Sequence, residues 1–105
     1  MLGNFLNKQM LGKMGAMQQQ MEEIKAKLEN ISVIGEADNS TCRAVASGNR
    51  LIKEITLNDE FLKNATKQEI ESAIVQASNR ALEQAARVEQ SEMSHAAMSI
   101  LPGLG

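Results

Sequence analysis

Hydrophobic positions recur at spacings of three and four along the longest uninterrupted stretch of the chain, from Thr66 to about Ala97, which contains no Gly or Pro. At about 100° per residue these positions fall on one stripe, so the pattern predicts a long helix with one face on a core. The stripe consists of Ile70, Ala73, Ile74, Ala77, Ala81, Ala85 and Val88. Thr66 and Glu69 fit the S/T-x-x-E capping box, which marks the start of the helix.

Small side chains spaced four residues apart form a ridge along this stripe: Ala73, Ala77, Ala81 and Ala85. An alanine ridge allows a sheet or another helix to approach the helix backbone closely. A neighbouring stripe is also apolar and consists of Val75, Leu82, Ala86 and Met93. The apolar surface is therefore broader than one packing layer needs, and we interpret the excess as a contact with a second copy of the chain.

A second helical pattern occupies the N-terminal third of the chain. Its apolar residues alternate spacings of four and three over three heptads: Met10, Met14, Met17, Met21, Ile24, Leu28 and Ile31. Such a methionine seam is typical of a helix that packs on another element, and the alternative is a flexible methionine-rich groove for a ligand. Three glycines precede or interrupt the pattern, and each costs a helix about 1 kcal/mol relative to Ala. We therefore expect residues 1–9 to be a frayed lead-in.

Between the two helical patterns the chain is rich in β-branched and short polar residues, which favour strands. Three such segments, at 31–34, 41–46 and 51–57, are separated by turn formers, and they predict an antiparallel meander. The tight turn before the third strand contains Gly48 and Asn49, which tolerate positive φ.

The third strand is expected to point Leu51, Ile55 and Leu57 at the core. After it, Asn58 is a suitable N-cap for a short helical turn, in which Phe61 and Leu62 would plug the end of the core. Residues 99–105 contain Pro102 and two glycines, and we expect them to form a loose tail.

Size and composition bound the fold to one small domain over residues 1–105. With no Trp or Tyr and only two Phe, the interior has few large anchors, and a second copy of the chain would help to stabilise it. The predicted class is α+β: an N-terminal helix, a three-stranded antiparallel sheet, a short helical turn and a long C-terminal helix. A start without a compact apolar run, and the lack of any apolar stretch near 20 residues, lead us to expect a cytoplasmic protein.

Signatures of catalysis are scarce, since the sequence has one His, one Cys and no CxxC, P-loop or GxGxxG motif. His95 has no second His or Cys at ligand spacing, which favours a solvent-facing helix residue over a metal ligand or catalytic base. Cys42 suits a reducing compartment, and its place in a strand pattern favours a small core residue over a nucleophile. We expect no enzyme activity, no cofactor and no metal.

Basic residues are more informative, although the formal net charge of −2 means that any contact with nucleic acid must come from local patches. Lys13 and Lys27 lie along one edge of the methionine seam, two heptads apart, and Lys25 lies on the opposite flank. Arg80 and Arg87 are seven residues apart at the edge of the alanine ridge. The alternative is an ordinary solvated face, on which Arg87 pairs with the glutamate four residues before it.

Three stretches of the chain, in this order and spacing, resemble the YbaB/EbfC family of nucleoid-associated DNA-binding proteins of bacteria. They are MGAMQQQME at 14–22, ITLNDEFL at 55–62, where the family often has I-D-P-x-L-L, and IVQASNRA at 74–81, where it has a run like V-x-A-x-N-D-A. The sequence also departs from the family. Arg80 stands where Asp is usual, the turn at 35–39 is poorer in glycine, and the often basic positions 82–84 are Leu-Glu-Gln.

The resemblance implies a homodimer with helices projecting from a central β-sheet layer, which binds double-stranded DNA and helps to organise the nucleoid or regulate gene expression. DNA phosphates would then be neutralised by basic residues from two subunits: Lys13, Lys25, Lys27, Arg80 and Arg87. The alternative is a protein-interaction or scaffold module that uses its methionine seam and alanine-rich face. The salt dependence of DNA binding separates the two, because phosphate contacts release counterions.

Overall fold

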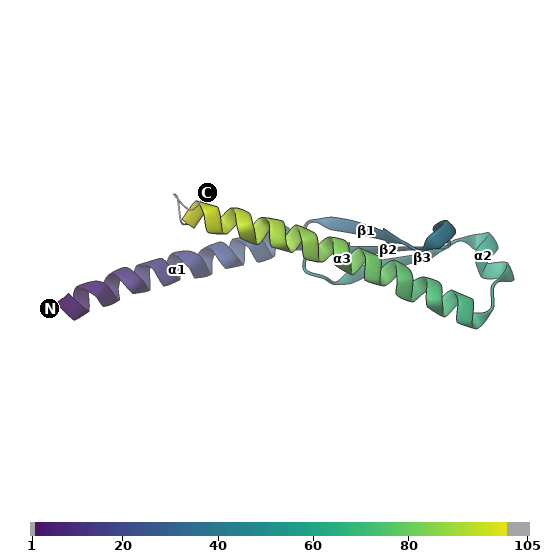
Figure 1. Ribbon diagram of the computed structural model, residues 1–105, viewed down its shortest axis with the longest axis horizontal. Helices are drawn as coiled ribbons and strands as arrows, with labels where there is room; N and C mark the ends of the chain where they lie inside the picture. The colour runs from purple at the N-terminus through teal and green to yellow at the C-terminus, as the bar shows by residue number, and fades with distance from the viewer. Residues whose placement is uncertain (1, 101–105) are drawn as a thin grey trace.

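The computed structural model describes the backbone of residues 2–100 and the side chains of residues 15–98. The elements follow in the order α1 (Leu2–Glu29), β1 (Ser32–Glu36), the 3-10 turn η1 (Asp38–Ser40), β2 (Cys42–Ser47), β3 (Ile52–Leu57), α2 (Asp59–Asn64) and α3 (Lys67–Ile100). The molecule is elongated, at 75 × 23 × 20 Å, with α3 lying along the sheet and α1 continuing beyond one end of it (Figure 1). The predicted α+β class and element order are confirmed.

The two long helices extend further than their sequence patterns suggest. Helix α1 begins at Leu2, so it includes residues 2–9, where we expected a lead-in that frays. Helix α3 continues to Ile100 and takes in the first two residues of the expected tail, whereas residues 101–105 lie outside the described part of the chain.

Both predicted helix starts are confirmed by their hydrogen bonds. At the start of α3, the Thr66 N–H donates to Glu69 Oε1 at 2.9 Å, and the Glu69 N–H donates to Thr66 Oγ1 at 3.2 Å. This reciprocal pair lowers the pKa of the Glu69 carboxyl, chiefly through the hydrogen bond from the Thr66 backbone. At the start of α2, Asn58 Oδ1 accepts a hydrogen bond from the Phe61 N–H at 3.0 Å.

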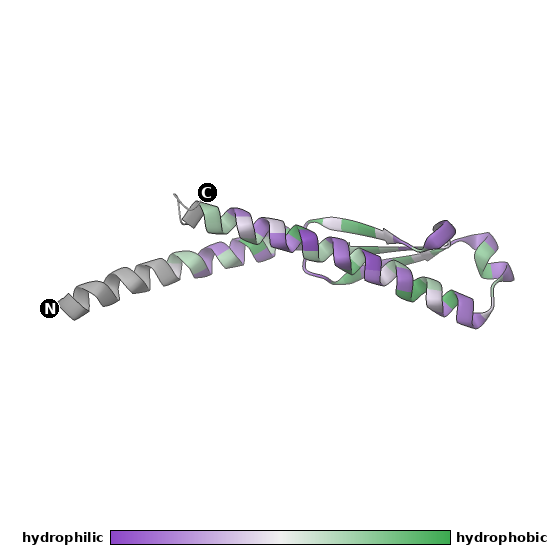
Figure 2. Ribbon diagram, in the orientation of Figure 1, coloured by the Kyte–Doolittle hydropathy of each residue, from purple (hydrophilic) through white to green (hydrophobic). Residues whose placement is uncertain are grey.

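The sheet is an antiparallel meander with strand order β1-β2-β3, and α3 packs on one of its faces. Along α3 hydrophobic and hydrophilic residues are interspersed, as a helix with a single buried face requires (Figure 2). The core is built from small side chains, and its members are Ala37, Cys42, Ala44, Ala46, Ala73, Ala77 and Ala81. The sheet is therefore the partner of the predicted alanine ridge, of which Ala77, Ala81 and Ala85 are completely buried.

Gly35 lets β1 approach the backbone of α3. It pairs with Ala44 across the β1–β2 ladder and lies beneath the alanine ridge. A Cβ atom placed at Gly35 would lie 2.8 Å from Ala81 Cα and closer still to the Ala81 nitrogen and the Ala77 carbonyl oxygen. The obstacle is backbone, which cannot move aside as a side chain can, so only glycine fits here.

The turn between β2 and β3 has its positive φ at Arg50, at 65°, and not at Gly48 or Asn49, which could tolerate it. Gly48 instead serves a close approach to α1: its N–H lies 2.9 Å from the Leu28 carbonyl oxygen, and an added Cβ would meet Leu28 Cδ2 at 2.9 Å. The requirement for glycine comes from the end of α1, which turn composition alone does not reveal.

Strand β3 is less buried than predicted. Leu51 is 60% exposed and Ile55 36% exposed, although Leu57 packs against the core as expected. The reason is that α3 lies over β1 and β2 and touches β3 little. At the end of the core, Phe61 packs against the buried cluster, but Leu62 points to solvent and does not act as a plug.

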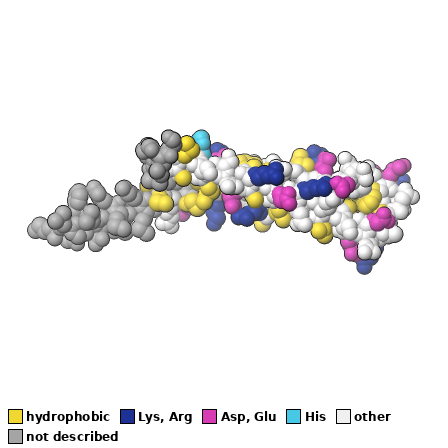
Figure 3. All heavy atoms as spheres, in the orientation of Figure 1, with side chains coloured by type: hydrophobic (Ala, Val, Ile, Leu, Met, Phe, Trp, Pro, Cys, Tyr) yellow, Lys and Arg dark blue, Asp and Glu magenta, His cyan; other side chains and the backbone are white. Residues whose placement is uncertain are grey.

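The methionine seam of α1 has a partner over only part of the described helix. Ile24 and Leu28 are buried, whereas Met17 and Met21 are about half exposed, at 51% and 48%. In Figure 3 hydrophobic side chains gather where α1 runs beside the C-terminal part of α3. The seam is thus an interhelical contact near the sheet, and it becomes a surface further from the sheet.

Gly35, at the contact with α3, and Gly15, on an open face of α1, provide a matched test of the close approach between β1 and α3. We expect Gly35→Ala to destabilise the protein by about 3 kcal/mol or more, because the added methyl group overpacks against fixed backbone. Gly15→Ala, at an exposed position of α1 with no atom near the added Cβ, should leave the unfolding midpoint unchanged or raise it. Urea titrations followed by circular dichroism measure both, and equal midpoints would contradict the packing described above.

Candidate nucleic-acid interface

Basic side chains of the two long helices are interspersed with acidic ones, as Figure 3 shows along α3. Basic side chains of these helices and of the sheet form exposed ion pairs within the chain: Lys27–Glu92, Arg43–Glu36, Arg50–Glu89, Lys67–Glu71 and Arg80–Asp38. Exposed pairs of this kind contribute about 0–1 kcal/mol each to stability. Their main effect is to reduce the positive potential that a phosphate would meet.

The two predicted lysines in the described part of α1 lie on opposite sides of its contact with α3. Lys27 Nζ is 2.9 Å from Glu92 Oε2, in a shallow depression that His95 also lines. Lys25 lines a groove on the other side, between α1, the β2–β3 turn and α3. Lys25 has no ion pair with any described side chain. The side chain of Lys13 lies outside the described residues.

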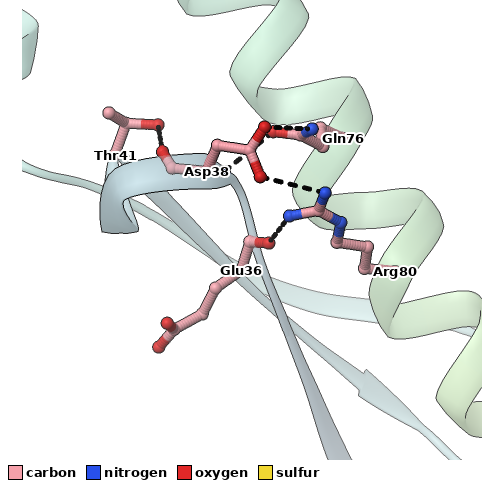
Figure 4. Close-up of polar contacts among 5 residues, drawn as sticks. All are labelled: Glu36, Asp38, Thr41, Gln76 and Arg80. Atoms are coloured by element: carbon pink, nitrogen blue, oxygen red, sulfur yellow. Dashed lines mark hydrogen bonds and ion pairs between the residues drawn. The ribbon is translucent and has the colours of Figure 1, made fainter.

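Arg80 is held by the turn that joins β1 to β2 (Figure 4). Its Nη1 donates to the Glu36 carbonyl oxygen at 2.8 Å, and its Nη2 lies 3.0 Å from Asp38 Oδ1. Gln76, one turn earlier on α3, makes two hydrogen bonds with Asp38. Its Oε1 accepts from the Asp38 N–H at 2.8 Å, and its Nε2 donates to Asp38 Oδ2 at 3.1 Å. The predicted DNA contact is therefore engaged within the chain.

These bonds stabilise the ionised form of Asp38. The hydrogen bond from Gln76 has the largest effect, followed by the hydrogen bond and charge of Arg80, and together they lower the pKa of the Asp38 carboxyl below its ordinary value of 3.8. The carboxylate stays charged at neutral pH and keeps Arg80 in place.

Arg87 lies on the same flank of α3, about 10 Å further along the helix axis at 1.5 Å per residue. Its side chain is exposed. We considered an ion pair with Glu83, but the described residues contain no ion pair of Arg87. The structure thus places Arg80 and Arg87 on one flank as predicted, and only Arg80 is engaged.

Two further basic residues contact the long helices and were not predicted. Arg50 Nη2 is 2.7 Å from Glu89 Oε1, and Lys53 Nζ donates to the Glu29 carbonyl oxygen at 3.4 Å. Both belong to the β2–β3 hairpin: Arg50 reaches α3, and Lys53 reaches the end of α1. Helical spacing could not detect them, because these contacts arise from the folding of the hairpin against the two helices.

The two residues considered for catalysis are placed as predicted. His95 is exposed on α3, and within the described residues no group of three or more His, Cys, Asp or Glu side chains could hold a metal ion. Cys42 is 1% exposed in β2, and burial raises the pKa of its thiol, so it is a small core residue. None of the described helices combines the length and hydrophobicity needed to cross a membrane.

The geometry defines a small α+β protein in which a long helix backs a three-stranded sheet and both long helices present basic side chains. Residues 4–100 match the YbaB/EbfC DNA-binding family, and the chain belongs to this family. The resemblance seen in the sequence is confirmed.

Relatives and one solved structure agree with this assignment. A nucleoid-associated protein of Ruminiclostridium cellulolyticum is 34% identical over 89 residues, which cover 85% of this chain and 74% of the relative. Another, of Chlorobium phaeobacteroides, is 31% identical over 83 residues, 79% of this chain and 73% of the relative. The crystal structure of an uncharacterized protein from Helicobacter pylori has the same fold, with a TM-score of 0.61 at 11% identity, over 84% of this chain and 98% of that one.

The bonds to Asp38 predict a specific pH dependence. Because its folded pKa is lowered, the stability gained from its ionisation is fully present above the unfolded value, near 3.8, and is lost as the pH falls through the folded value. The wild type should therefore unfold at a higher temperature than Asp38→Asn at neutral pH, and the gap should close below about pH 4. Thermal scans of both proteins between neutral pH and about pH 2.5 would show it. The pKa of Glu69 is also lowered, but Glu69 is present in both proteins, so its effect on the difference in unfolding temperature cancels. A difference that does not change with pH would contradict this role of Asp38.

Proposed function

We propose that this protein binds duplex DNA as a homodimer through phosphate contacts, and that it acts in the bacterial nucleoid, in organising DNA or regulating gene expression. The observation that carries the proposal is the match of residues 4–100 to a DNA-binding family, since this range includes β1–β3, α2 and almost all of both long helices. Relatives named as nucleoid-associated proteins support the location.

Phosphate contact is the mode of binding that suits the described side chains. Arg87 and Lys25 are exposed and carry charge that no described acidic side chain neutralises. The sequence spacing predicts that Lys13 lies along the same edge of α1 as Lys27, and a phosphate could replace Glu92 as the partner of Lys27. Contacts of this kind position a protein on DNA without reading bases, so binding should depend weakly on sequence.

A homodimer is supported by the uncovered flank of the sheet. Strand β3 pairs only with β2, so its outer edge presents unpaired N–H and C=O groups to solvent. Ile52 and Ile55 on this strand are exposed, and the half-buried Leu82 of α3 packs against the core nearby. An apolar edge strand invites pairing with another chain, and a second copy would cover it and double the number of basic side chains.

A scaffold function, in which the methionine seam binds another protein, has the exposed Met17 and Met21 in its favour. It makes the opposite prediction about salt, since burial of an apolar seam releases no counterions.

The DNA test is a titration of unrelated duplexes with the protein at about 50 and 200 mM salt, followed by fluorescence anisotropy. Binding through six or more phosphates from two subunits should weaken by about a thousandfold between these conditions. Duplexes of different sequence should behave alike. Failure to bind at low salt, or an affinity that does not respond to salt, would favour the scaffold alternative.

The dimer test uses two substitutions on opposite faces of the sheet. Ile55→Lys puts a charge on the uncovered flank and should convert the dimer to a folded monomer in sedimentation experiments at micromolar concentration. Ile34→Lys is the matched control, because Ile34 is similarly exposed, at 45%, and occupies the face that α3 does not cover. A monomeric wild type, or a dimer that survives Ile55→Lys and dissociates with Ile34→Lys, would sink the proposed interface.

A further inference from the structure

The guanidinium of Arg80 on α3 contacts two groups of the segment that joins β1 to β2. One nitrogen of Arg80 reaches the Glu36 carbonyl oxygen and another reaches the Asp38 carboxylate, at 2.8 and 3.0 Å (Figure 4). The planar fork of arginine can make two such bonds at once, whereas the single ammonium of lysine cannot reproduce this geometry. The bond to a backbone carbonyl shows that Arg80 holds the chain itself and does more than balance a charge.

Gln76 completes this attachment. Its amide bonds both the backbone N–H and the second carboxylate oxygen of Asp38, at 2.8 and 3.1 Å. Asp38 is thus held through three of its polar groups by two side chains one turn apart on α3.

The turn held in this way has a costly backbone. Asn39 and Ser40 both have left-handed conformations, with φ of 61° and 55°. Residues other than glycine adopt this region at a cost, and they keep it where the surroundings determine it. Within the turn itself, Thr41 Oγ1 donates to the Asp38 carbonyl oxygen at 3.1 Å, and the Ala37 N–H donates to the Cys42 carbonyl oxygen at 2.9 Å.

The same attachment makes Arg80 a poor phosphate ligand. A phosphate would have to compete for the guanidinium with the Asp38 carboxylate and with the Glu36 carbonyl oxygen. Arg87, two turns along the same flank, has neither obstacle among the described side chains. We propose that Arg80 is a positioning residue that fastens the β1–β2 turn to α3, and that Arg87 is the phosphate contact of this flank. The first part stands alone, and the second rests on the proposed function.

The test compares Arg80→Lys, Arg80→Gln and Arg87→Gln for stability and for DNA binding. Both Arg80 variants should lower the thermal unfolding midpoint, by about 4–8 °C for a loss typical of one such contact in a small domain. Arg80→Lys keeps the positive charge but should not restore the midpoint, because the fork is lost. Arg87→Gln should unfold at the wild-type temperature.

DNA binding should show the reverse pattern. Arg87→Gln removes two contacts from a homodimer and should reduce the slope of log affinity against log salt by about 2 units. Arg80→Gln should keep the wild-type slope. An Arg80→Lys variant as stable as the wild type would overturn the fastening role, and a slope reduced equally by Arg80→Gln and Arg87→Gln would make Arg80 a phosphate contact.

The double variant Asp38→Asn with Arg80→Gln tests the pairing itself. If the two residues act through each other, the double variant should lose little more than the more damaging single variant, whereas additive losses would contradict the pairing. Wild-type protein that binds no DNA would overturn the proposed function and the role of Arg87 together. The unfolding midpoints would still decide the role of Arg80, so the two failures are distinguishable.

Discussion

The contact on which the rest of the structure depends is the close approach of the α3 backbone to β1 and β2. Alanines at every fourth position of α3 meet Gly35, Ala44 and Ala46, so helix and sheet pack with almost no side chain between them. The largest fully buried side chains are Cys42 and Ser47. Each such residue removes little apolar surface from water, so the stability of this core depends on many close backbone contacts along a long helix.

A core this narrow also determines what remains on the surface. Because α3 lies over β1 and β2 at short distance, larger apolar side chains do not fit beneath it. Ile52 and Ile55 of β3 are left uncovered beside α3, and Ile34 is exposed on the other face of the sheet. The thin interior and the apolar surface thus have the same cause. A chain with larger core residues would have a thicker interior and less need of a second copy.

Features of the fold that depend on near neighbours in sequence could be predicted, and features that depend on distant segments could not. The capping box at Thr66, the N-cap at Asn58 and the alanine ridge each involve residues three or four apart, and all were found as expected. The burial of Ile55 was misjudged because it depends on which strands α3 covers. Composition marked Gly48 as a turn residue that tolerates positive φ, whereas the close approach of the end of α1 is what requires a glycine there.

The candidate interface shows the same division. Helical spacing placed Lys25 and Lys27 on opposite flanks of α1 correctly, but it could not detect Arg50 and Lys53, which the hairpin brings to α3 and to the end of α1 respectively. Nor could it show that Arg80 has a partner 42 positions earlier. Arg80 and the turn that contains Asp38 were both noted as departures from the family pattern. In the structure, Arg80 and Asp38 of this turn form an ion pair, so the two positions at which the sequence departs from the family pattern are in contact with each other.

A protein with a net charge of −2 that binds DNA must present its basic side chains at low cost, and its ion pairs differ in that cost. Lys27 contacts Glu92 through one exposed pair, which contributes about 1 kcal/mol or less, so under the proposed function a phosphate would take the place of the carboxylate at little cost. Arg80 would have to give up a carboxylate and a backbone carbonyl together, and the strained turn with them. The exposed charges of Arg87 and Lys25 need no exchange at all. Under the proposed function, the availability of each basic residue to phosphate depends on what that residue already holds within the chain, more than on its exposure.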